Sequence, residues 1–114
     1  MKRTLFVLIY FCAICVTSAY AHPPRDIKIS YDPSTKMLRA VIEHGTSNPS
    51  AHYIKKVDIS LNGKEILQQE ISRQDDGSSQ HVVYFIPDAK VGDEISVEGY
   101  CSIGGKLKKR ITVQ

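Results

Sequence analysis

The segment YIKKVDISLNGK, residues 53–64, decides the fold class. Every second residue from Val57 to Leu61 is apolar, which is the period of a strand that buries one face. Asn62-Gly63 follows directly, and both residues tolerate the positive φ angles of a two-residue hairpin turn. The segment therefore predicts a β-hairpin.

The same two-residue period recurs on both sides of this hairpin, and turn residues such as Asp32-Pro33 and Gly104-Gly105 separate the periodic stretches. No window shows a sustained helical period. We therefore expect an all-β domain, a seven-stranded antiparallel immunoglobulin-like β-sandwich. A polar stretch, residues 74–79, is expected to be a flexible connection. The expected strands cover residues 27–31, 38–42, 53–61, 64–72, 81–86, 94–102 and 106–113.

The start of the chain has a different character. Lys2-Arg3 precedes an apolar run, and Ala19-Tyr20-Ala21 gives the small-x-small pattern that signal peptidase reads. The apolar run is shorter than the about 20 residues that a membrane-spanning helix needs. We expect a cleaved signal peptide over residues 1–21 and a periplasmic or secreted domain over residues 22–114, with no membrane span after cleavage. An uncleaved anchor is the alternative.

Cleavage would remove most of the net charge. The chain has 15 Lys and Arg against 12 Asp and Glu, and Lys2 and Arg3 leave with the signal peptide, so 13 basic residues remain against the same 12 acidic ones. The basic residues that cluster over 106–110 alternate with apolar ones, as on a solvated strand face. We therefore expect no nucleic-acid partner.

Cleavage would also leave a single cysteine, Cys101, because Cys12 and Cys15 lie in the signal peptide. One cysteine cannot form an internal disulfide. In an oxidising compartment a lone thiol is stable when it is buried, paired with another chain or bound to a metal. Cys101 is in phase with Ile95 and Val97, so a buried core thiol is one reading of it.

Four histidines supply the other metal-binding side chains. His44 ends one expected strand and His52 begins the next, so both imidazoles can lie at one end of the sandwich, where Cys101 also ends a strand. Imidazole and thiolate together suit iron, copper or zinc better than calcium or magnesium. The alternatives are that His44 and His52 cap turns, that His81 is an edge residue and that His22 belongs to a disordered terminus.

One resemblance rests on His44, on the run HYIKKVDI over residues 52–59 and on the Asn-Gly-Lys that follows it. These residues resemble the iron domain of superoxide reductases, the desulfoferrodoxin and neelaredoxin family. Tyr100-Cys101-Ser-Ile-Gly-Gly corresponds to the Tyr-Cys-Asn-x-His-Gly signature of that family. The resemblance covers roughly residues 37–113 and implies an immunoglobulin-like sandwich. It also implies a mononuclear non-haem iron held by histidine nitrogens, with a cysteine sulfur as axial ligand and an open position for superoxide.

Carried over residue by residue, the resemblance makes His44, His52 and Cys101 metal ligands. Gly104 stands where the family has a histidine, and no histidine in residues 26–31 matches the N-terminal ligand of the family. The resemblance therefore implies an incomplete site, with oxidoreductase activity of the superoxide reductase type if that site is active. An external electron donor would then be required, since the chain has no rubredoxin-like cysteine cluster.

His22 can replace one of the missing ligands. As the first residue of the mature chain it offers an imidazole and a free α-amine, a combination that suits copper. Pro23 and Pro24 would stiffen the arm that presents it. We therefore include His22 among the expected ligands, with iron as the expected metal and copper or zinc as alternatives.

A second resemblance competes with the first. Residues 48–54, NPSAHYI, and the Val-Gly-Asp-Glu run from Val91 are similar to the cysteine-free Z subunit of the sulfur-oxidation carrier complex. That resemblance implies a non-catalytic module that binds an exported protein partner. Three classes remain at this point: an iron protein related to superoxide reductase, a partner-binding module, and a structural sandwich without a ligand.

Overall fold

The structure is a computed structural model that describes residues 22–114. The expected signal peptide, residues 1–21, lies outside the described residues. Seven strands follow one another without an intervening helix in the described part of the chain. They are β1 (Asp26–Asp32), β2 (Met37–Glu43), β3 (Ile54–Leu61), β4 (Lys64–Glu70), β5 (Ser79–Phe85), β6 (Glu94–Cys101) and β7 (Lys106–Thr112).

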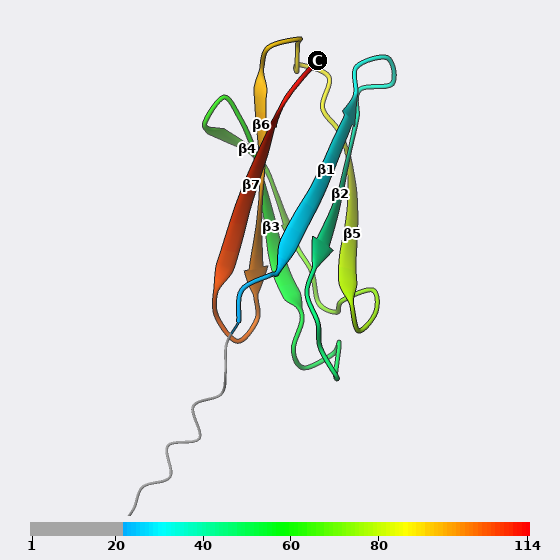
Figure 1. The fold of residues 1–114 in the computed structure, drawn as a ribbon, viewed down its shortest axis with the longest axis vertical. Coiled ribbons are helices and arrows are strands. Elements are labelled where there is room, and N and C mark those ends of the chain that lie inside the picture. The colour runs from blue at the N-terminus through cyan, green and yellow to red at the C-terminus, as the bar shows by residue number, and fades with distance from the viewer. Residues whose placement is uncertain (1–21) are drawn as a thin grey trace, which may run out of the picture.

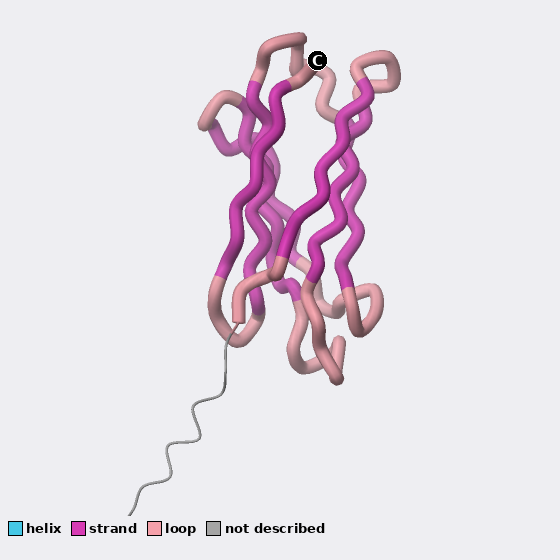
Figure 2. The backbone as a smooth tube through the Cα atoms, viewed as in Figure 1, coloured by secondary structure: helices cyan, strands magenta, loops and turns pink. Residues whose placement is uncertain are grey.

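The strands form two antiparallel sheets that face each other (Figures 1 and 2). One sheet has the order β1-β2-β5 and the other has the order β4-β3-β6-β7. The chain crosses from one sheet to the other after β2, after β4 and after β5. This architecture confirms the expected seven-stranded antiparallel sandwich of immunoglobulin-like type.

The predicted hairpin joins β3 to β4. Asn62 and Gly63 both have positive φ, 50° and 82°, as a turn of this length requires. The Asn62 side chain then holds the neighbouring loop, because its amide group donates to Asp93 Oδ1 and its Oδ1 accepts from the N–H of Glu94. The return strand ends at Glu70, two residues earlier than the sequence predicts.

The core fills the space between the two sheets with the inward residues of each strand. In β6, Ile95, Val97 and Cys101 are all buried and share one face, as their spacing predicts. In β3 a register irregularity between Ile54 and Lys56 interrupts the alternation. Because of this irregularity, Ile54 and Val57 are both fully buried although three positions separate them.

Several connections lie at one end of the sandwich, the end opposite the C-terminus (Figure 1). They are the N-terminal arm before β1, the loop between β2 and β3, the loop between β4 and β5, and the hairpin between β6 and β7. The Thr46 N–H donates to the Gly77 carbonyl at 2.9 Å and the Gln74 N–H donates to the Pro49 carbonyl at 3.1 Å, so two of these loops support each other. None of the elements in residues 22–114 is a helix with the length and apolar character to cross a membrane.

Candidate metal centre

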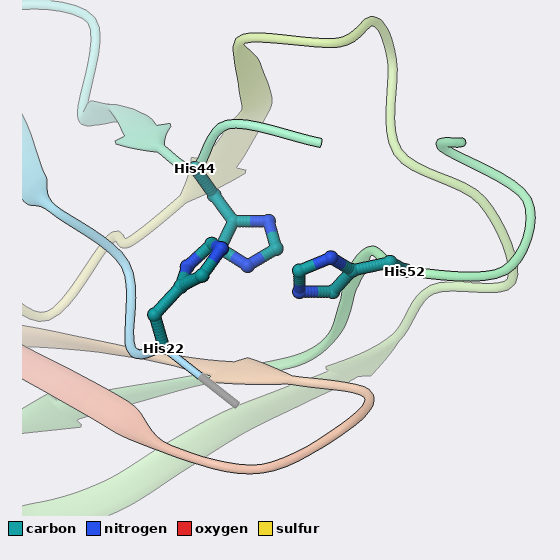
Figure 3. Close-up of side chains that lie close together, drawn as sticks. All are labelled: His22, His44 and His52. Atoms are coloured by element: carbon teal, nitrogen blue, oxygen red, sulfur yellow. The ribbon is translucent and has the colours of Figure 1, made fainter. Parts of the chain in front are cut away.

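Three histidine side chains from three separate segments converge at this end of the sandwich (Figure 3). The ring centroids of His44 and His52 are 4.7 Å apart, and those of His22 lie 5.2 Å from His44 and 4.9 Å from His52. One nitrogen from each ring lies within 4.8 Å of the other two. Two nitrogens that bind one ion lie about 3 to 4 Å apart, because each bond is about 2.1 Å long. Small rotations of the side chains are therefore enough to close the group around a metal.

His44 is the most rigidly held of the three. It follows β2 directly, its backbone N–H donates to the Ser78 carbonyl at 2.9 Å, and its side chain is buried. Its ring Nδ1 lies 2.8 Å from Oε1 of Gln74. Ser78 and Gln74, which do not belong to the histidine group, therefore fix the position and the orientation of the His44 ring.

The Gln74 amide group also determines which nitrogen of His44 carries the proton. The Gln74 Nε2 donates to two backbone carbonyls, those of His44 at 2.7 Å and Asp76 at 2.9 Å. Carbonyl oxygens only accept, so the amide cannot be reversed, and its Oε1 must accept from His44 Nδ1–H. The proton is therefore on Nδ1, and the lone pair of His44 is on Nε2.

The Nε2 atom of His44 is buried and has no hydrogen-bond partner among residues 22–114. A buried polar atom without a partner is uncommon, because leaving it unsatisfied costs about 1 to 3 kcal/mol. In His44 this atom is a ring nitrogen with a free lone pair, and the ring contacts those of His22 and His52. A lone pair of this kind could bind a metal ion supplied from outside the chain.

His52 connects the histidine group to the only cysteine among the described residues. Its backbone N–H donates to the Asn48 carbonyl at 2.9 Å in the loop before β3. Its ring Nε2 lies 3.1 Å from Sγ of Cys101, which is buried at the end of β6. The two segments are joined by the Ser102 N–H, which donates to the Tyr53 carbonyl at 2.8 Å. A thiol is thus in direct contact with one of the three imidazoles.

The electrostatic environment favours the neutral forms of His44 and His52. Burial lowers the pKa of His44 below its ordinary value, and the neighbouring rings of His52 and His22 act in the same direction, whereas the hydrogen bond to Gln74 opposes them. Burial also lowers the pKa of His52, with a further contribution from His22. Neutral rings have the free lone pairs that metal binding needs.

A cleft of about 690 Å³ opens beside the cluster, and His22 and His44 line it. Arg25, Gly45 and Ser78 form other parts of its wall. The cleft gives the histidine group a path to solvent even though His44 itself is buried. The exposed His22 and this cleft place one side of the histidine group next to solvent.

The structure brings most of the sequence-predicted ligands together. His22, His44 and His52 form the group, and Cys101 lies beside it through its contact with His52. His81 lies on the exposed face of β5 and takes no part. Sequence reasoning missed Gln74, which was placed in a flexible connection and is instead almost completely buried. Nothing in a single glutamine within a polar loop marks it as the partner of a histidine 30 positions away.

Comparisons of the chain with protein-family models, with curated proteins and with solved structures find no match.

Proposed function

We propose that this chain is an exported transition-metal-binding protein related to the superoxide reductases. His22, His44 and His52 would hold the ion, and Cys101 would supply a thiolate to it. The observation that carries the proposal is the buried Nε2 of His44, which has no hydrogen-bond partner in the described part of the chain. Gln74 directs this atom, and two further imidazoles lie beside it. A structural histidine in the core would be expected to have both ring nitrogens satisfied.

The donor set supports a borderline or soft ion. The group of potential ligands consists of histidines, with a cysteine sulfur 3.1 Å from one of them. Imidazole and thiolate suit iron, copper and zinc, whereas calcium and magnesium require oxygen ligands. Iron is the ion that the resemblance to superoxide reductases implies. When bound, it would supply one-electron chemistry.

The contact between His52 and Cys101 supports the assignment of the sulfur. With the thiol proton removed on metal binding, His52 Nε2 and Cys101 Sγ become two donors that point to the same region. Cys101 would then be a metal ligand as well as a buried core residue. His22 would stand in for a histidine that the family carries and that is Gly104 here.

Metal analysis of anaerobically purified protein tests the proposal. We expect about one iron, copper or zinc ion per chain, and we expect the Cys101→Ala variant to hold less. If the bound ion is iron, the oxidised wild-type protein should show a thiolate-to-iron charge-transfer band that the variant lacks. Absence of bound metal in both proteins, together with no uptake of added iron(II), copper(II) or zinc(II), would contradict the proposal.

A further inference from the structure

The N-terminal arm that carries His22 is packed against the sandwich. Pro24 is buried, and the Arg25 N–H donates to the Glu43 carbonyl at 2.7 Å. Pro23 lies directly on Gly105, where an added Cβ would come within 2.9 Å of the Pro23 nitrogen. The β6–β7 hairpin thus has a surface without a side chain at the point where the arm crosses it. His22 is presented by an anchored backbone.

The backbone nitrogen of His22 is bonded to the Cα whose side chain carries the imidazole of the histidine group. When a residue precedes His22, that nitrogen is part of an amide, and its lone pair is delocalised into the carbonyl group. When His22 is the first residue, the same nitrogen is an α-amine, whose deprotonated form has a free lone pair. The amine and the imidazole of one histidine can then chelate a single ion.

Pro23 restricts how the chain can bind an ion through its backbone. Proline has no N–H, so the peptide nitrogen that follows His22 cannot lose a proton and become a ligand. The α-amine is therefore the backbone nitrogen at this terminus that can add to the three imidazoles. Such a set of nitrogen donors suits copper(II), which also has the highest affinity in the divalent series.

We infer that the α-amine of His22 is a further metal ligand, so that removal of residues 1–21 completes the metal centre. This inference rests on the proposed metal-binding function and on cleavage after Ala21. Its consequence is that the precursor binds the ion more weakly than the mature chain. Metal loading is then coupled to export.

The test compares copper(II) binding by two forms of the domain, and both contain the seven described strands and the described core. One form starts at His22, released by a protease that leaves no extra residue, and the other retains residues 18–21. Affinity is measured by competition with a chelator, and EPR spectra report the nitrogen donors. We expect the longer form to bind more than about 100-fold more weakly, because the loss of a direct ligand should exceed the 10- to 100-fold cost of losing an outer-shell partner. We also expect its EPR spectrum to differ.

Two further samples separate the outcomes. The form that starts at His22 is also prepared with an acetylated α-amine, which adds no residue and should behave like the longer form. The His44→Ala variant, starting at His22, shows whether copper(II) binds at the proposed centre. Equal affinities and spectra for the free, acetylated and longer forms, with binding that depends on His44, would overturn the role of the amine and leave the metal centre intact. Binding that does not depend on His44 in any form would overturn both.

Discussion

Nδ1 of His44 and Oε1 of Gln74 lie 2.8 Å apart, and this one contact determines which nitrogen of the histidine is available to an ion. The amide is locked by its two bonds to backbone carbonyls and by the Ile54 N–H, which donates to the same Oε1 at 3.2 Å. Gln74 is thus a positioning residue, which acts on the ion through His44. A ligand histidine commonly has such an outer partner on its second nitrogen.

Replacing Gln74 with methionine should therefore weaken metal binding by about 10- to 100-fold. Methionine has nearly the same length, but its thioether sulfur is only a weak acceptor for Nδ1–H, so the proton is free to move to Nε2. Nitrogen-15 NMR of the metal-free protein should show His44 protonated at Nδ1 in the wild type and a shifted tautomer balance in the variant. The Gln68→Met variant is a matched control on the exposed strand β4 and should change neither property. An unchanged tautomer in Gln74→Met would contradict the role of Gln74.

Adding a methyl group at Gly105 should displace the N-terminal arm. Gly105 has a φ of +86°, and its Cβ would meet Pro23, whereas Gly92 has a φ of +91° and open space around its Cβ. Gly105→Ala and Gly92→Ala therefore impose a similar backbone strain of about 1 to 2 kcal/mol, and chemical denaturation should report it in both. Only Gly105→Ala should also lower metal affinity, because it moves His22. Equal metal affinities in the two variants would show that the position of the arm does not matter.

Cys101→Ser tests the sulfur with little change of volume. We expect the serine variant to keep the fold with a loss of about 1 to 2 kcal/mol, since a hydroxyl replaces a buried thiol. We expect a lower affinity for copper(I), which prefers soft thiolate ligands, and a smaller change for zinc(II). Equal copper(I) affinity in wild type and variant would place Cys101 in the core and outside the metal centre.

The stability of the metal-free protein should fall as the pH drops below 6.5. Burial lowers the pKa of His44 from that ordinary value, so between the folded and unfolded pKa values the unfolded chain binds more protons than the folded one. The contribution of His44 to the free energy of unfolding is complete above pH 6.5 and is lost as the pH falls through the pKa of His44 in the folded protein. Urea unfolding at pH 7.5 and pH 5.5 should show the decrease, and His44→Asn should reduce it. Aspartates such as Asp76, whose pKa lies below 3.8, act only at lower pH. A flat profile between the two pH values would refute the prediction.

The strands could be predicted because each depends on local alternation and on turn residues nearby. The run from Val57 to Leu61 and the turn at Asn62 are of this kind. The irregularity beside Ile54 could not be predicted, because it appears only when β3 pairs with β6. Burial of Cys101 followed from its phase with Ile95 and Val97, but its contact with His52 depends on how two loops fold back.

The candidate site, like the fold, could be predicted only where it depends on residues close together in the sequence. His44 and His52 flank one loop, so their proximity follows from chain order, and the anchored position of His22 depends on the absence of a side chain at Gly105. Gln74 could not be foreseen, since its role arises from four hydrogen bonds to distant or backbone atoms. A polar loop in the sequence can therefore contain a buried residue that determines the chemistry of the site.

The most direct measurement is an anaerobic iron(II) titration of the wild type beside His44→Ala and His81→Ala. Both variants lose one imidazole, but His44 is buried in the histidine group, whereas His81 is exposed on β5 and does not belong to that group. We expect about one bound iron(II) in the wild type and in His81→Ala, and an affinity at least about 100-fold lower in His44→Ala. Equal iron(II) binding in all three proteins would contradict the metal centre, and no iron(II) binding by the wild type would contradict iron as its ion.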